Sequence, residues 1–258
     1  MEGLGGQVGA PAREPNTRSP RAAVRLPRPL VPVVVVRRVN RFAVAARCRG
    51  CLLYLHLPNS GRMGELLRPG ARGMAYLHAK RSGRTDGVLL LVRHRGRWVG
   101  LDARMPNRLF AAALDAGTLR PFCGYARPRP EVRFPGGRID YVLEGRTVPC
   151  LVETKSCNRV DGSVALFPDA PSARGARHLR TLAAAVRRGW RAAVVWFVQR
   201  DDATVLRPFA AADPVFAAEA QRAAARGVEF YAYTCRVTLR EMALRRQIPV
   251  DLAPVSSR

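Results

Sequence analysis

The sequence predicts an α/β domain with a mixed sheet, preceded by a small all-β barrel. Between residues 31 and 105, short runs of β-branched and aromatic residues alternate with turns that contain Gly or Pro. From residue 122 onward, three strand-like segments are followed by helices that alternate with further strands, the order typical of an α/β sandwich. The chain has 258 residues, 48% of them hydrophobic, which is enough for two domains with separate cores.

The first 30 residues are predicted to be a disordered basic tail, because prolines and arginines alternate there without hydrophobic periodicity. Candidate strands then span 33–36, 42–46, 52–57, 74–78, 88–92 and 98–101. Their number and spacing predict a small barrel of the OB type, and an SH3-like barrel would give nearly the same pattern. Arg38 and Arg41 lie near Phe42 and Tyr54, a composition suited to single-stranded nucleic acid.

Residues 106–121 are predicted to link the two domains through a helix. Asn107 precedes a helical run over 108–116, and Gly117 follows at the expected C-terminal capping position. Residues 122–258 are predicted to form the second domain. Its expected strands are 131–134, 138–143, 149–155, 192–198 and 228–235, and its expected helices are 173–188 and 213–226.

The charge of the chain indicates a polyanionic partner. With 44 basic and 19 acidic residues, the formal net charge is +25, and nucleic acid is the commonest partner of such a protein. The alternative is a basic, solvated surface without a specific partner. Six scattered cysteines do not form a disulfide framework, and the apolar runs are too short to span a bilayer. We therefore expect a cytoplasmic protein with no membrane association.

A lysine in an arginine-rich sequence marks the most informative segment. Only two of the 44 basic residues are lysines, and one of them, Lys155, lies two positions after Glu153. If the strands on either side of the turn at 144–147 form a hairpin, Asp140 lies opposite Glu153. Strand alternation places Lys155 on the same face as Glu153. The three side chains are thus predicted to converge on one pocket.

Two facing carboxylates repel each other, and a bound Mg²⁺ would offset that repulsion. The metal would lower the pKa of a bound water, while Lys155 would orient this water or stabilise the charge that develops at phosphorus. The sequence therefore indicates a metal-dependent phosphodiesterase with Asp140, Glu153 and Lys155 as catalytic residues. The alternative interpretation of the same residues is an ordinary salt-bridged sheet surface.

Several short strings occur together in the order found in one family. They are PNSGRM at 58–63, RIDY at 138–141, ETKS at 153–156, FPDA at 167–170, RG at 174–175 with HL at 178–179, and QR at 199–200. Over residues 31–252, the chain resembles the sugar fermentation stimulation (SfsA) family of prokaryotes. The resemblance implies an OB-like domain followed by a restriction-endonuclease-like domain of the PD-(D/E)xK nucleases, with Asp140, Glu153 and Lys155 in the catalytic positions.

The resemblance also implies a cofactor and a nucleic-acid partner, either DNA or RNA. Asp140 and Glu153 would bind Mg²⁺ or Mn²⁺, with Glu131 as a further acidic ligand. The residues expected to contact nucleic acid are Arg38, Arg41, Arg62, Arg138, Arg174, His178 and Arg200. The chain departs from the usual family pattern at Gly137, Asn158 and Ala173, where the family usually has serine, threonine and glutamate.

We therefore expect a nucleic-acid-binding protein that acts as a Mg²⁺-dependent DNA or RNA nuclease. The alternative is a non-catalytic DNA-binding protein that regulates genes of sugar metabolism, although no helix-turn-helix pattern favours recognition of a specific operator. A carbohydrate enzyme gains no support from the residues. The sequence leaves open the strand preference, the mode of cleavage and the oligomeric state.

Overall fold

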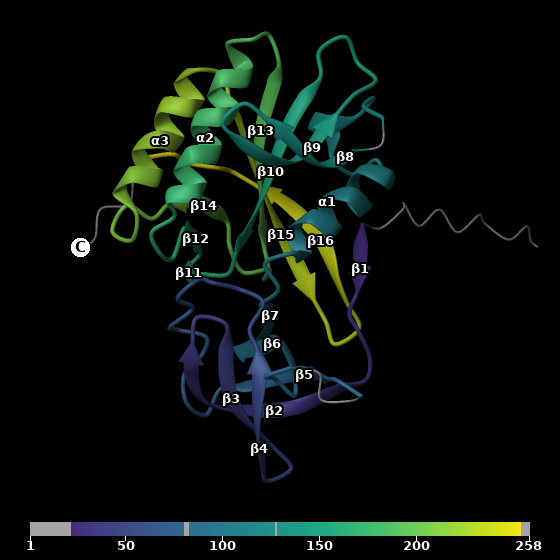
Figure 1. Cartoon of the computed structure of the whole chain (residues 1–258), viewed down its shortest axis with the longest axis vertical. Coiled ribbons are helices and arrows are strands. Elements are labelled where there is room, and N and C mark those ends of the chain that lie inside the picture. Colours follow the sequence, from purple (N-terminus) through teal and green to yellow (C-terminus); the bar gives the residue numbers. More distant parts are fainter. Residues whose placement is uncertain (1–21, 80–82, 127, 254–258) are drawn as a thin grey trace, which may run out of the picture.

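The computed structural model of the chain describes residues 22–79, 83–126 and 128–253. They form a β-barrel and a larger α/β domain, which lie at the bottom and the top of Figure 1. The predicted fold class, an OB-like barrel followed by a mixed-sheet α/β domain, is confirmed. None of the helices in the described part of the chain is long and apolar enough to cross a membrane.

The barrel is built from six strands. They are β2 (Leu30–Asn40), β3 (Ala43–Cys48), β4 (Cys51–His56), β5 (Arg72–Leu77), β6 (Gly87–His94) and β7 (Arg97–Gly100). Their order is β4-β3-β2-β5-β6-β7, and parallel pairing of β4 with β6 closes the barrel. Val33 and Val35 on β2 point into the barrel core, while Val34 between them is exposed, as strand alternation requires.

The second domain is organised around a seven-stranded mixed sheet in the order β1-β16-β15-β13-β10-β9-β8. Its strands are β1 (Ala23–Arg25), β8 (Arg129–Phe134), β9 (Gly137–Leu143), β10 (Cys150–Cys157), β13 (Arg191–Val198), β15 (Glu229–Val237) and β16 (Glu241–Ile248). The central strands β10, β13 and β15 are parallel, and the outer strands are antiparallel to their neighbours. A smaller sheet contains β11 (Val160–Asp161), β12 (Val164–Phe167) and β14 (Val205–Pro208).

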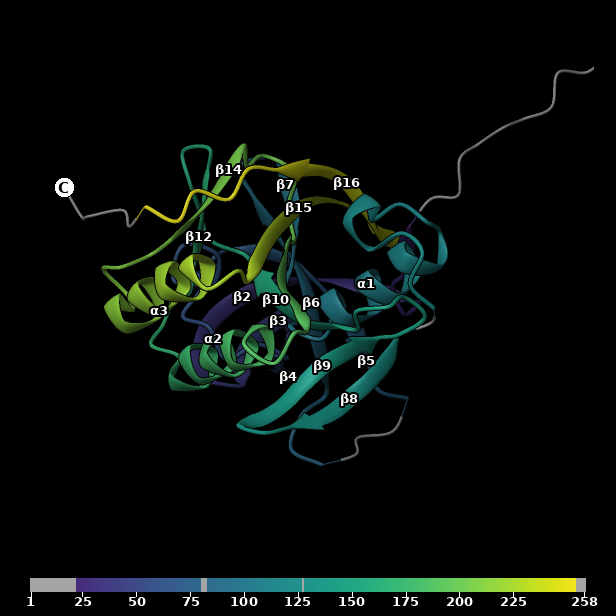
Figure 2. The same cartoon turned by 90° about the horizontal axis from the view of Figure 1, so that it is seen from above.

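Helices cover both faces of this sheet, as the view from above shows (Figure 2). The helix α1 (Met105–Asp115) packs on one face, while α2 (Ala173–Val186) and α3 (Pro214–Ala225) pack on the other. A short 3₁₀ helix, η1 (Arg120–Phe122), follows α1. Gly117 ends α1 with a φ of +63°, a conformation that favours glycine, as the capping prediction expects.

The structure differs from the sequence prediction at the edges of the sheets. Residues 1–21 of the predicted tail lie outside the described residues. Residues 22–30 are not a disordered tail: β1 pairs with β16, and Val24 lies in the core shared with α1. The strand β16 and the three strands of the small sheet are also absent from the prediction. Each is short or interrupted by charged residues, so its stability depends on neighbouring strands rather than on a local pattern.

Candidate active site

The hairpin of β9 and β10 brings the two predicted carboxylates together. Leu143 pairs with Cys150 and Tyr141 pairs with Val152. One further step in the same register places Asp140 opposite Glu153, as predicted from the turn between the strands. The backbone N–H of Thr154 donates to Asp140 Oδ2 at 2.9 Å. The hairpin therefore holds both carboxylates at the end of the antiparallel pairing, where the strands begin to separate.

Glu153 is buried in the central part of the sheet, with only 2% of its surface exposed. Its Oε1 accepts hydrogen bonds from Lys155 Nζ and from His178 Nδ1. Burial alone would raise the pKa of Glu153, but the charge of Lys155 and the hydrogen bond from His178 lower this pKa to about 2. Its Oε2 is also buried and has no hydrogen-bond partner among the described residues. Glu153 is thus ionised, with one oxygen unused.

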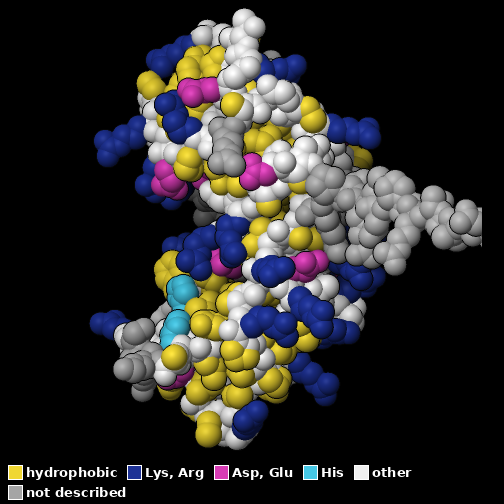
Figure 3. Space-filling model, turned by 90° about the vertical axis from the view of Figure 1, so that its right-hand side faces the viewer, with side chains coloured by type: hydrophobic (Ala, Val, Ile, Leu, Met, Phe, Trp, Pro, Cys, Tyr) yellow, Lys and Arg dark blue, Asp and Glu magenta, His cyan; other side chains and the backbone are white. Residues whose placement is uncertain are grey.

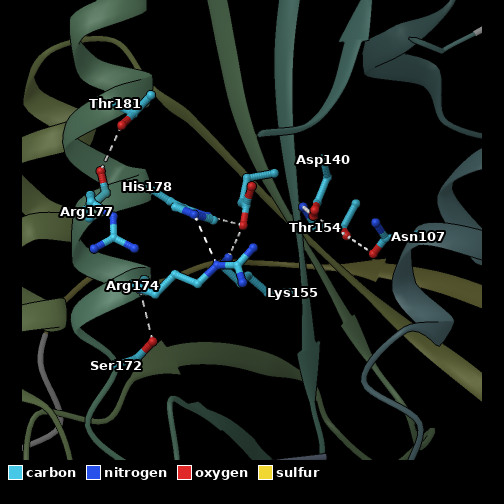
Figure 4. A network of polar contacts seen from close by, with 11 residues as sticks. Asn107, Asp140, Thr154, Lys155, Ser172, Arg174, Arg177, His178 and Thr181 are labelled. Atoms are coloured by element: carbon cyan, nitrogen blue, oxygen red, sulfur yellow. Dashed lines mark hydrogen bonds and ion pairs between the residues drawn. The ribbon is translucent and has the colours of Figure 1, made fainter. Parts of the chain in front are cut away.

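Asp140 has a different electrostatic environment. Burial and the negative charge of Glu153 raise its pKa above the ordinary value, although Lys155 and Thr154 oppose this shift. Thr154 Oγ1 lies 2.8 Å from Asp140 Oδ2 and 2.8 Å from Asn107 Oδ1. Asn107 belongs to α1, so the helix on one face of the sheet fixes the orientation of Asp140. Figure 4 shows Asp140, Thr154 and Asn107 to the right of His178.

His178 approaches Glu153 from the other side, on α2 (Figure 4). The Ser172 side chain caps this helix by accepting from the Gly175 N–H at 3.0 Å. Arg174 Nε donates to His178 Nε2 at 3.3 Å. Because a guanidinium can only donate, His178 Nε2 accepts, and its Nδ1 carries the proton that is donated to Glu153. Arg174 and His178 therefore hold the Glu153 carboxylate in one orientation.

A cavity of about 560 Å³ opens above these residues, between the barrel and the α/β domain. Asp140, Glu153 and Lys155 line it from the sheet, and Arg41 lines it from the barrel. The barrel loop that follows β4 is fixed on the second domain. Met63 N donates to Asp169 Oδ2 at 2.9 Å, and Asn59 Nδ2 donates to Asn158 Oδ1 at 3.1 Å. The predicted catalytic residues therefore lie in a cavity that both domains enclose.

Comparison with known proteins identifies the family. The model of the SfsA N-terminal OB domain matches residues 36–101, and the model of the sugar fermentation stimulation protein RE domain matches residues 104–241. The chain belongs to the SfsA family. The resemblance seen in the sequence is therefore confirmed.

Relatives within the SfsA family match almost the whole chain. The sugar fermentation stimulation protein homolog of Moorella thermoacetica is 46% identical over 89% of this chain and 100% of its own length. The homolog of Symbiobacterium thermophilum is 44% identical over 84% of this chain and 93% of its own. A solved structure of Pyrococcus furiosus SfsA in complex with Ca²⁺ has a TM-score of 0.80 and 30% identity. The match covers 86% of this chain and 96% of the Pyrococcus furiosus chain.

Some of the SfsA-family residues predicted to contact nucleic acid lie at the cavity. Arg41 and Arg174 line it and are exposed, and Arg62 is exposed in the neighbouring barrel loop. Arg38 is less accessible. Its guanidinium donates to the backbone carbonyls of Asn40, Arg41 and Arg62, so its main role in the structure is to fix the loops that carry Arg41 and Arg62.

Two of the residues predicted to contact nucleic acid, His178 and Arg200, are buried in the structure. The side chain of Arg200 is fully buried and forms a bidentate ion pair with Asp202, with two distances of 2.6 Å. It is therefore not available to a phosphate. His178 is only 3% exposed and contacts Glu153 and Arg174 instead of the cavity surface. His178 lies on α2 and Arg200 follows β13, and the burial of both side chains depends on tertiary packing.

Glu131 and Arg138 pair with each other. The register of β8 and β9 places Glu131 across from Asp140, but Glu131 is about half exposed and pairs with Arg138 at 2.8 Å. Neither residue lines the cavity. Within the described residues, no three or more Asp, Glu, His or Cys side chains form a group that could hold a metal. The structure therefore does not bring Glu131 to the site as a third acidic ligand.

Other residues at the site had no predicted role. Asn107 and Thr154 orient Asp140, while Asp169 and Asn158 hold the barrel loop. Gln199 Nε2 donates to the Asp102 carbonyl at 2.8 Å and to Ser156 Oγ at 2.7 Å, and so joins the two domains. The only sequence signal for Asp169 and Gln199 was their presence in the strings shared with the family.

The site fits a divalent cation of the Mg²⁺ type. Such an ion is usually held by one or two carboxylates, with water and substrate phosphate as the remaining ligands. Asp140 and Glu153 supply two carboxylates, and the unpartnered Oε2 of Glu153 is a buried oxygen whose desolvation a cation would offset. A site with two carboxylates is sufficient for this mode of binding, even though no third acidic side chain joins them.

Proposed function

We propose that this protein is a divalent-metal-dependent phosphodiesterase that hydrolyses nucleic acid in the cavity between its two domains. The observation that carries the proposal is the buried, ionised Glu153, which lies beside Asp140 and Lys155 and has one oxygen without a hydrogen-bond partner in the described part of the chain. The related protein from Pyrococcus furiosus has been solved in complex with Ca²⁺, which supports a divalent cation in this family.

The residues of the chain have separate roles in the proposed reaction. Asp140 and Glu153 would hold the cation, which when bound neutralises phosphate charge and lowers the pKa of a water ligand. Lys155 has 16% of its side chain exposed, so its ammonium can reach a phosphate in the cavity. There it would stabilise the negative charge that develops in the transition state. His178 acts as a positioning residue for Glu153.

The charge of the molecule favours nucleic acid over a small phosphate ester. The net charge is +25, and Lys and Arg side chains gather where the barrel meets the α/β domain on the face shown in Figure 3. Arg41 and Arg174 stand on opposite sides of the cavity, one on the barrel and one on α2. A long polyanion would contact both domains at once, which a small ester would not do.

The direct test is cleavage of labelled single- and double-stranded DNA and RNA in the presence of Mg²⁺, Mn²⁺ or EDTA. We expect cleavage with either metal, none with EDTA, and a loss of at least about 100-fold for Lys155→Ala. Arg226→Ala, an exposed cation at the end of α3, is the control and should cleave like the wild type.

Calorimetric titration with Ca²⁺ tests the cation site without relying on activity. Asp140→Asn should abolish binding, and the exposed Asp161→Asn should not change it. If Lys155→Ala retains full cleavage, the proposed chemistry is wrong. Nucleic-acid binding without metal-dependent cleavage would instead favour the alternative, a non-catalytic DNA-binding regulatory protein.

A further inference from the structure

A second cavity, of about 400 Å³, continues from the candidate active site onto the barrel. The two cavities share four lining residues, Arg41, Asn59, Ser60 and Ala103. They therefore form one groove that runs from Lys155 across the domain junction. The far part of the groove is lined by Phe42, His56, Pro58 and Arg104. Nothing in the proposed phosphodiester chemistry uses this part of the groove.

Phe42 is the most unusual residue of this groove. It follows β2, with its backbone fixed by a hydrogen bond from its N–H to Asn40 Oδ1 at 2.8 Å and by its carbonyl, which accepts from Leu57 N at 2.8 Å. Its side chain nevertheless leaves half of its surface exposed. A phenyl ring that is held by a rigid backbone but not covered by other side chains is suited to stacking on a planar, apolar ligand.

The groups around Phe42 define the chemistry of that ligand. Arg41 provides positive charge on one side, and His56 adds a second ring. Arg104, whose side chain is largely exposed, lines the other side and is ion-paired with Asp102 at 3.0 Å. Beyond His56, the outward-facing residues of β4 are Tyr54 and Leu52, which are 38% and 49% exposed. Cations beside exposed rings are the composition that binds the backbone and the splayed bases of a single strand.

We propose that the groove at Phe42 and His56 binds an unpaired base next to the phosphate that is cleaved, so that the substrate is single-stranded nucleic acid. The inference rests on the proposed function, because it places the scissile phosphate at Lys155. A base in a duplex is stacked on its neighbours and presents only its edge, whereas an unpaired base exposes a face on which Phe42 stacks. The strand then continues along the outer face of β4.

The test is the affinity of fluorescently labelled oligonucleotides, measured by anisotropy in EDTA so that no cleavage occurs. The probes are a single-stranded twelve-mer and the duplex formed with its complement. Phe42→Ala should weaken binding of the single strand by about tenfold, the range of one base–aromatic stack, and leave duplex binding unchanged. Phe42→Trp should bind within about twofold of the wild type. Phe42→Leu keeps an apolar side chain without a ring and should lose nearly as much as Phe42→Ala.

Val215→Ala, which removes a more exposed apolar side chain on α3, is the matched control and should have no effect. Equal affinities of wild type and Phe42→Ala for the single strand would overturn the inference. So would an equal loss for single strand and duplex. A protein that cleaves with Mg²⁺ but gives either result keeps the proposed function without the stacking site. A protein that binds single strands through Phe42 but never cleaves keeps the stacking site and loses the nuclease.

Discussion

At the scale of single residues, the Glu153 carboxylate depends on His178 for its orientation. The imidazole donates from Nδ1 to Glu153 Oε1 and accepts from Arg174 at Nε2. Removing a residue that orients a metal ligand typically lowers metal affinity by 10- to 100-fold. We therefore expect His178→Ala to raise the Kd for Ca²⁺ by about 10- to 100-fold, as measured by calorimetry.

A conservative replacement separates this positioning role from simple loss of packing. His178→Asn retains an amide donor near the position of Nδ1, so it should recover most of the affinity that His178→Ala loses. Thermal unfolding of both variants shows how far each one destabilises the fold. A His178→Ala protein that remains folded and binds Ca²⁺ as tightly as the wild type would contradict the role given to His178.

The positions of some site residues follow from a local sequence pattern, whereas the positions of others depend on tertiary packing. The register that brings Asp140 across from Glu153 follows from the position of the turn between β9 and β10, which is a property of the sequence. The burial of Arg200 does not. An arginine is usually exposed, but the side chain of Arg200 is buried. Asp202 and the backbone carbonyl of Asn158 accept its hydrogen bonds. No periodic pattern in the sequence predicts that this side chain is buried.

At the scale of elements, the barrel loop at 59–63 determines how the two domains enclose the cavity. Gly61 lies so close to Asp169 that an added Cβ would be 2.5 Å from Asp169 Oδ1. The same carboxylate is held by the N–H of Met63. Gly61→Ala should therefore displace Asp169 and lower the free energy of unfolding by about 1–3 kcal/mol, the usual cost of overpacking.

A double-mutant cycle with Asp169→Ala tests this contact by urea denaturation. The cost of Gly61→Ala should fall sharply when Asp169 is already alanine, because the clashing oxygen is then absent. Gly64→Ala is the matched control, since a Cβ there meets no atom within 4 Å. If Gly61→Ala costs the same in both backgrounds, the contact between this loop and Asp169 is not what fixes the domains.

The elements that the sequence reasoning missed share a dependence on distant partners. The three residues of β1 follow a Pro- and Arg-rich stretch and form a strand only because β16 offers an open edge. The strand β16 itself contains exposed Arg245 and Arg246, which weaken its hydrophobic pattern. By contrast, β13 is buried on both faces and reads as an almost continuous apolar run, so the sequence alone places it well.

At the scale of the whole molecule, both domains contribute residues to one groove. The barrel contributes Arg41 and Phe42 to the groove, and the α/β domain contributes the carboxylates and Lys155. Neither domain alone contains the complete site. The order of domains was visible in the sequence, but their mutual orientation was not, because it depends on side-chain contacts such as Asn59 with Asn158 and Gln199 with Asp102.

This arrangement predicts a specific dependence of binding on salt. Each phosphate contact that is lost should reduce the slope of log K against log salt concentration by about 0.7 for a single strand. Arg41→Gln should therefore lower the magnitude of the slope by about 0.7, as measured in EDTA between about 50 and 200 mM salt. Arg226→Gln removes the same charge away from the groove and should leave the slope unchanged. Equal slopes for Arg41→Gln and Arg226→Gln would show that net charge attracts the strand without a contact at Arg41.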